Sequence, residues 1–103
     1  MTTPPAPRSP VSPEVWAELQ RVIQRWRQLP LDHALSHATR VRRLVQSLAD
    51  QVAQVTGVRL LSVPDVGPAT LMDQLTVMVY DASATSATST LADDLARLRR
   101  ELS

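Results

Sequence analysis

Apolar residues recur along most of this chain with the three- and four-residue spacing of one helical face. The first series lies between residues 13 and 29 and comprises Trp16, Leu19, Ile23 and Trp26. It predicts an amphipathic helix over this range, because such spacing brings side chains to one side of a helix. Ser12 is a candidate N-cap, Pro13 suits the first helical position, and Pro30 ends the helix.

A longer series predicts a second helix over residues 31–56. Its apolar face comprises Leu31, Leu35, Ala38, Val41, Leu44 or Val45, Leu48, Val52 and Val55. Asp32 is a candidate N-cap, and Gly57 suits the left-handed conformation that commonly ends a helix. At 1.5 Å per residue this helix is on the order of 37 Å long. We expect it to be longer than any other helix of the chain can cover alone.

A connector over residues 58–67 leads to a third predicted helix over about 68–82. Pro68 fits the first turn of this helix. Its main apolar face comprises Leu71, Leu75, Met78 and Ala82. Val77 and Tyr80 fall on the other side, so we expect this helix to be buried centrally or to lie at an interface. The alternative is a strand at 75–80 paired with 58–63, although an isolated two-stranded ribbon is only marginally stable.

The last predicted helix covers about 90–102, with Thr90 as its N-cap. Its apolar stripe is regular and comprises Leu91, Leu95, Leu98 and Leu102. A stripe of this kind is suited to packing on another helix. Together the four series predict an all-α fold, a four-helix bundle-like domain with one long helix.

The N-terminal segment has a different pattern. It carries a proline at every third position, namely Pro4, Pro7, Pro10 and Pro13. Polyproline II has three residues per turn, so these rings would line one side of such a helix. We predict a disordered proline-rich tail over residues 1–12, followed by a single helical domain over 13–103. The tail is either a solvated extension or a ligand for an aromatic-lined groove on another protein.

Composition excludes several kinds of chemistry. The chain of 103 residues contains no cysteine, which excludes disulfides, thiol nucleophiles and cysteine-ligated metals. All 11 basic residues are arginine, which excludes Schiff-base chemistry and a Walker A lysine. The 2 glycines cannot form a three-glycine dinucleotide loop. We therefore predict no cofactor.

Charge and hydropathy also bear on the surroundings of the protein. The net charge of +1 gives no strong overall attraction for nucleic acid or an anionic membrane. No apolar run approaches the ~18–20 residues needed to span a bilayer, and the N-terminus has no secretory apolar segment. The absence of lysine, asparagine and phenylalanine, whose codons are AT-rich, indicates a GC-rich bacterial genome. We expect a cytoplasmic protein.

Two pairs of residues are candidates for chemistry. His33 and His37 are one helical turn apart, as in zinc-protease motifs, but Ala34 stands where those motifs carry a general-base glutamate. A zinc site also needs a third protein ligand, so we predict no metal. Asp73 and Asp81 share a broad side of the third helix and could act as acid and base only within a cleft. We predict no catalytic residue.

Residues 60–75, LLSVPDVGPATLMDQL, contain a tight turn before a helix. This stretch resembles the helix-hairpin-helix motif of DNA-repair and replication proteins, with Asp65 where that motif has its first glycine. The resemblance implies that Gly67 and Thr70, at the start of the helix, contact a DNA phosphate. Arg40, Arg42 and Arg43 are further candidates for phosphate contacts.

These observations favour a non-enzymatic protein-interaction or regulatory module that acts through helix–helix packing. The expected partner is a second copy of the chain, which would make a homodimer, or another protein. No membrane or small-molecule substrate is expected. The residues predicted to form the interface are Trp16, Ile23, Trp26, Val77 and Tyr80. The alternative function is weak DNA binding through the turn at 60–75 and the arginine cluster.

Overall fold

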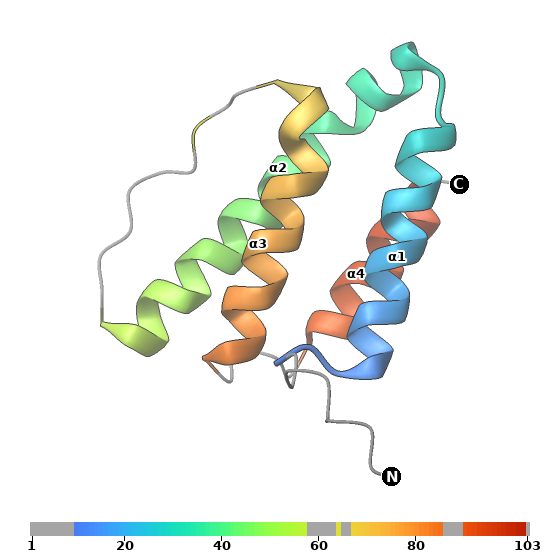
Figure 1. The fold of residues 1–103 in the computed structure, drawn as a ribbon. Helices are drawn as coiled ribbons and strands as arrows, with labels where there is room; N and C mark the ends of the chain where they lie inside the picture. The colour runs from blue at the N-terminus through green and yellow to red at the C-terminus, as the bar shows by residue number, and fades with distance from the viewer. Residues whose placement is uncertain (1–9, 58–63, 65–66, 86–89, 103) are drawn as a thin grey trace, which may run out of the picture.

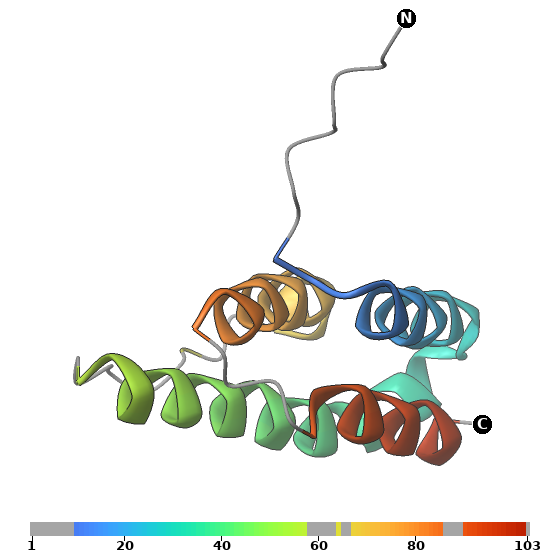
Figure 2. The ribbon, with the colours of Figure 1, turned by 90° about the horizontal axis from the view of Figure 1, so that it is seen from below.

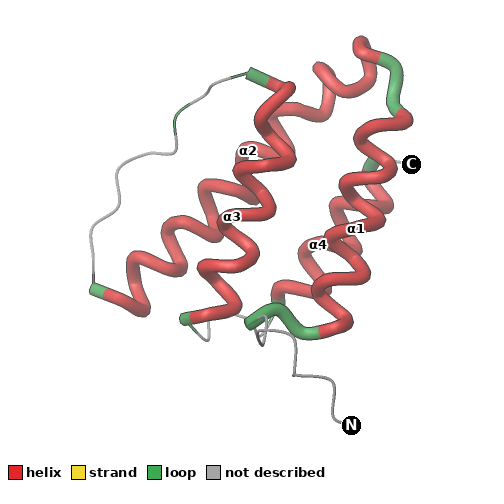
Figure 3. Tube along the Cα trace, in the orientation of Figure 1, coloured by secondary structure: helices red, strands yellow, loops and turns green. Residues whose placement is uncertain are grey.

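The described part of the chain is all-α, as the apolar spacing predicts. The computed structural model describes residues 10–57, 64, 67–85 and 90–102. These residues form four α-helices and one 3₁₀ turn and contain no strand (Figures 1 and 3). The elements are α1 (Pro13–Gln28), α2 (Leu31–Thr56), η1 (Pro68–Thr70), α3 (Leu71–Ala84) and α4 (Leu91–Glu101). The prediction of a helix rather than a strand at 75–80 is confirmed, and residues 58–63 lie outside the described residues.

The helices form two layers. Figure 2 shows α1 and α3 in one layer and α2 and α4 in the other. The main contacts run between the layers, where α1 packs on α4 and α3 packs on α2. In Figure 1, α1 and α4 run towards the upper end of the molecule, whereas α2 and α3 run towards the lower end. The end of α2 and the start of α3 therefore lie at opposite ends of the bundle.

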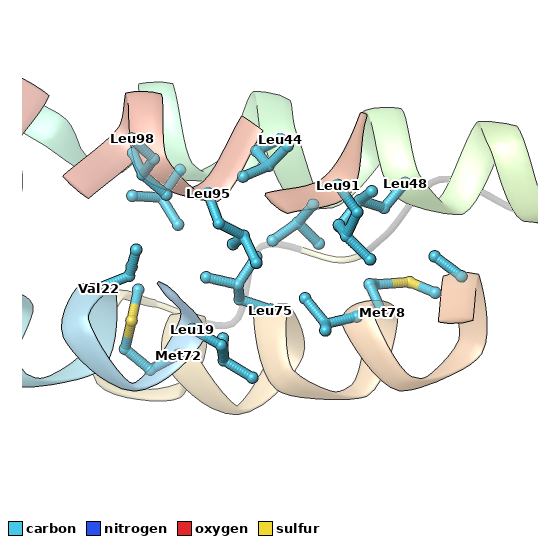
Figure 4. Packing of buried hydrophobic residues seen from close by; sticks show 14 of the residues in the cluster. Leu19, Val22, Leu44, Leu48, Met72, Leu75, Met78, Leu91, Leu95 and Leu98 are labelled. Carbon is cyan, nitrogen blue, oxygen red and sulfur yellow. The ribbon is translucent and has the colours of Figure 1, made fainter. Parts of the chain in front are cut away.

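The core between the layers consists of aliphatic side chains. Figure 4 shows Leu19 of α1 and Leu75 of α3 pointing towards Leu95 of α4 and Leu48 of α2. All four side chains are fully buried, and no polar or charged residue is buried in the described part of the chain. The predicted leucine stripe of α4 is confirmed, since Leu91, Leu95, Leu98 and Leu102 are each at most 1% exposed. This stripe joins the two layers.

The helix ends follow the expected chemistry in part. Ser12 caps α1, where its hydroxyl accepts a hydrogen bond from the Val15 backbone N–H at 3.3 Å and Pro13 takes the first position. Gly57 ends α2 with φ 71°, in the left-handed region that favours glycine. The prediction of Asp32 as the N-cap of α2 is wrong. The helix begins at Leu31, and Pro30, which has no side-chain hydrogen-bond acceptor, occupies the cap position.

The predicted apolar stripe of α1 is wrong in part. Val15, Leu19 and Val22 are the buried residues of this helix, whereas Trp16 is 42% exposed. Helix α1 packs on α4, so the side of α1 that faces α4 is the buried one. Trp16 instead contacts Tyr80 of α3, edge to face. Val11 is also buried, so packing begins within the segment predicted as a tail.

Helix α2 is longer than its neighbours, as expected. It has 26 residues, compared with 16 in α1, 14 in α3 and 11 in α4. Its middle is buried from Ala38 to Val52 on one side. Leu31, Leu35 and Val55, which belong to its predicted apolar face, are 68%, 49% and 57% exposed. The ends of α2 lie beyond the helices that cover its middle.

Candidate interaction surfaces

The structure distributes the five residues of the predicted interface over separate places. Trp16 of α1 and Tyr80 of α3 contact each other edge to face, with ring centroids 6.3 Å apart and planes at 81°. Ile23 is half-buried and packs against the core. Val77 is 58% exposed on the outer side of α3. Trp26 lines a different hollow, near the junction of α1 and α2. The structure therefore brings Trp16 and Tyr80 into contact and places Trp26 in the lining of a separate hollow.

Two large exposed apolar side chains, Leu31 and Leu35, lie where α1 meets α2. A hollow of about 300 Å³ is lined there by Trp26, Leu29, Leu31, Ala34, Pro68 and Ala69. Leu35 lies one helical turn after Leu31 on the same side of α2, so it projects beside this hollow. We call these seven residues the apolar end. It lies at the upper end of the molecule in Figure 1, where α1, α2 and η1 come together.

Of the seven residues of the apolar end, only Trp26 is predicted from the sequence to lie at an interface. Leu31 and Leu35 follow the helical spacing of an apolar face. This spacing alone does not show that both side chains are exposed. The signal that could have found them is length, because α2 has 26 residues and its neighbours have at most 16. A helix that extends beyond its neighbours exposes the ends of its apolar stripe.

A second hollow lies between α1 and α3. It has a volume of about 360 Å³ and is lined by Val11, Pro13, Trp16 and Tyr80. We call these four residues the aromatic groove. Val11 and Pro13 place it where the chain enters α1, directly after the proline-rich segment. Figure 2 shows α1 and α3 side by side in the layer that carries this groove.

The residues proposed for phosphate contacts lie on α2 and at the start of α3, and one of the arginines is paired with a carboxylate. Arg40 donates a hydrogen bond from Nε to Oε2 of Glu101 at 2.6 Å, so a carboxylate of α4 lies beside its charge. Arg40 and Arg42 project about 200° apart around α2. Thr70 uses its hydroxyl to donate to the Gly67 carbonyl at 3.2 Å. Residues 60–63 and 65–66 of the predicted DNA-binding turn lie outside the described residues.

The candidate metal and acid–base residues are not assembled into sites. His33 is exposed and His37 is half-buried. Within the ranges that the structure describes, no group of three histidine, aspartate or glutamate side chains could hold a metal ion. Asp73 lines an apolar hollow together with Val77 and Met78, and the lining residues described for that hollow do not include Asp81. The two aspartates therefore do not face one another in a cleft.

An ion pair and a hydrogen bond join α1 to the α4 segment. The Glu18 carboxylate accepts hydrogen bonds from Arg99 Nε at 2.9 Å and from Arg21 Nη1 at 3.0 Å. The bond from Arg99 is the main reason why the pKa of Glu18 lies below its ordinary value, and partial burial of the carboxyl opposes this effect. Arg25 also donates from Nε to the Leu102 carbonyl at 3.0 Å. These contacts hold the α1–α4 pair in register.

Comparisons with protein-family models, with curated proteins and with solved structures found no match to this chain. None of the described helices combines the length and the apolar character that crossing a membrane requires. The surfaces of the molecule are therefore interpreted from their own geometry and chemistry.

Proposed function

We propose that this protein is a non-enzymatic interaction module that pairs with a second copy of itself through the apolar end. The observation that carries the proposal is the exposure of Leu31 and Leu35, at 68% and 49%, beside an apolar hollow. Fully burying a leucine side chain stabilises a protein by roughly 1.5–3 kcal/mol. Pairing would therefore recover stabilisation that the monomer leaves unused.

The shape of the apolar end supports a second copy as the partner. A two-fold interface uses the same patch on both subunits, so the patch has to complement itself. Here a projecting side chain, Leu35, lies next to a hollow lined by Trp26, Leu29 and Ala34. A two-fold axis between the two features would place Leu35 of each copy in the hollow of the other. Trp26 would then lie in the interface, as predicted from the sequence.

The proposal that the protein is not an enzyme rests on which side chains line the hollows. Those at the apolar end and at the aromatic groove are lined by aliphatic, aromatic and proline side chains. Apart from the Tyr80 hydroxyl, these lining side chains carry no group that commonly serves as an acid, a base or a nucleophile. Such surfaces are suited to binding another chain through apolar contact.

Light scattering coupled to size exclusion tests the pairing over micromolar concentrations. The wild-type chain of 11.4 kDa is expected at twice its mass at high concentration. The Leu31→Gln/Leu35→Gln double variant should dimerise only at a much higher concentration than the wild type, because glutamine favours the helix but not the contact. Val55→Gln, at the far end of the same helix and 57% exposed in the wild type, is the matched control and should dimerise as the wild type does. A wild-type monomer at every concentration, or a double variant that dimerises as tightly as the wild type, contradicts the proposal.

A further inference from the structure

The aromatic groove has the geometry of a surface for an extended ligand. Its two rings, Trp16 from α1 and Tyr80 from α3, are in edge-to-face contact with planes at 81°. Trp16 is 42% exposed, although tryptophan buries more apolar area than any other side chain when it is covered. Pro13 and Val11 border the groove at the start of α1. The groove therefore offers ring faces to a ligand that lies along it.

The polar atoms of the two rings are available to such a ligand. Among the described residues, none accepts a hydrogen bond from the Trp16 indole N–H or the Tyr80 hydroxyl. Tryptophan and tyrosine at binding surfaces commonly place the ring on apolar atoms and the polar atom on a partner. A polyproline II segment offers both kinds of contact. Its proline rings are apolar surfaces for the aromatic rings, and its backbone carbonyls, which have no internal hydrogen bonds, can accept from the polar atoms. Aromatic-lined grooves recognise proline-rich segments in this way.

The chain itself contains such a segment next to the groove. Pro4, Pro7 and Pro10 are spaced at the period of polyproline II, and Pro10 is the first described residue. The structure already shows this geometry at the entrance to α1, where Ser12 has φ −67° and ψ 156°. Nine residues before Pro10 would extend about 28 Å at 3.1 Å per residue. This length is sufficient to reach a groove on a neighbouring molecule.

The spacing of the prolines disfavours binding of the segment to the aromatic groove of the same molecule. Val11 and Pro13 line the groove, so the segment would have to reverse direction immediately before them. Each proline restricts the preceding residue to extended conformations, which applies to Ala6, Ser9 and Ser12. A chain restricted at every third residue resists a tight reversal. A second copy can present its segment without that reversal.

Charge also favours the contact. Arg8 is the only charged side chain in residues 1–9. The charged side chains of α3 are Asp73 and Asp81, which are both exposed. By helical spacing, Asp73 lies two turns from Tyr80 on the same side of α3. A basic ligand segment would therefore lie beside an acidic helix face.

The geometry points to the aromatic groove as a binding site for the proline-rich segment, residues 1–9, of a second copy of this chain. In a pair of molecules the exchange would be reciprocal, with each segment on the partner's Trp16 and Tyr80. This contact is separate from the apolar end and does not depend on it.

Two complementary full-length variants test the proposal. Pro4→Ala/Pro7→Ala keeps the groove and alters the segment, and Trp16→Ala keeps the segment and removes the groove. We expect the Trp16 indole N–H resonance of ¹⁵N-labelled Pro4→Ala/Pro7→Ala protein to shift, saturably, when unlabelled Trp16→Ala protein is added. The matched control is a triple variant, Pro4→Ala/Pro7→Ala/Trp16→Ala, which should cause no shift. A synthetic peptide of residues 1–10 replaces the Trp16→Ala protein if that variant does not fold.

Two results would overturn the proposal. The first is an unchanged Trp16 resonance on addition of both the intact segment and the peptide. The second is a Trp16 resonance that already differs between wild type and Pro4→Ala/Pro7→Ala at every dilution while mixing has no effect, since the segment would then bind its own groove. The Trp26 indole N–H, at the apolar end, reports on the other surface. The two indole resonances therefore distinguish failure of this inference from failure of pairing through the apolar end.

Discussion

The leucines of α4 and those at the start of α2 are alike in sequence and opposite in environment. Leu91 and Leu95 are four residues apart and at most 1% exposed. Leu31 and Leu35 are also four residues apart and are 68% and 49% exposed. The difference comes from the neighbours, because α4 lies between α1 and α2, whereas the start of α2 extends beyond its neighbours. Spacing therefore shows that a helix has an apolar face, and the neighbours decide whether that face is covered.

The largest effect is expected from truncating the covered stripe. Leu95 is 0% exposed at the centre of the core. Leu95→Ala should lower the free energy of unfolding by about 2–5 kcal/mol, because it removes buried methyl groups and leaves a cavity. Urea unfolding followed by circular dichroism measures this loss. A loss below about 1 kcal/mol would mean that α4 is not packed as the structure shows.

A smaller effect is expected at the start of α1. The Ser12 hydroxyl accepts a hydrogen bond from the Val15 N–H, and Val15 belongs to the side of α1 that packs in the core. Ser12→Ala should lower the free energy of unfolding by about 1 kcal/mol, as is typical for loss of an N-cap. Ser47→Ala, on the exposed side of α2, is the control and should have little effect. Equal effects of the two changes would argue against a capping role for Ser12.

The ion pair between α1 and α4 should contribute less, and its contribution should depend on pH. Glu18→Gln should lower the free energy of unfolding at pH 7 by about 0.2–1 kcal/mol, since the pair is partly exposed to solvent. The pKa of Glu18 is lowered in the folded protein, mainly by the hydrogen bond from Arg99. Its stabilisation is therefore present above the pKa of the unfolded chain and is lost as pH falls through the folded pKa.

Denaturant unfolding of wild type and Glu18→Gln at several pH values checks this dependence. The difference between the two proteins should be largest near neutral pH and should disappear in acid. Glu14→Gln is the control, because Glu14 is exposed on the same helix and should show no comparable dependence. A difference that persists unchanged into acid would show that packing, rather than charge, explains the effect of Glu18→Gln.

The smallest effect on the monomer is expected at Leu31. Leu31→Gln should change the free energy of unfolding by no more than about 0.5 kcal/mol in dilute protein, because this side chain is mostly exposed. At high concentration the wild type should become more stable than the variant, since pairing stabilises the folded state by mass action. Thermal unfolding at two protein concentrations measures both quantities. A large loss in dilute protein would place Leu31 in the monomer core, with Leu95.

The positions of the helices and of several helix ends could be predicted from the sequence alone. The leucine series of α4 and the Ser12–Pro13 start of α1 were predictable, because they depend on residues close together in the chain. Gly57 likewise marked the end of α2 through its tolerance of positive φ. The sequence favours a helix over a strand at 75–80 but does not exclude the strand. The structure shows the reason for the helix, since Leu75 and Val79 are both fully buried within the core.

Which apolar residues are covered depends on how the helices pack against one another. Periodicity orients side chains about the axis of their own helix and carries no information on the length or position of neighbouring helices. The spacing in α1 selects Trp16, which is also predicted at an interface, whereas packing on α4 buries Val15 and Val22, which the spacing omits. Leu31 and Leu35 lie on the predicted apolar face of α2 and are exposed, because α2 is longer than its neighbours. The aromatic groove also required the fold, because Trp16 and Tyr80 are distant in sequence and meet only when α1 and α3 lie side by side.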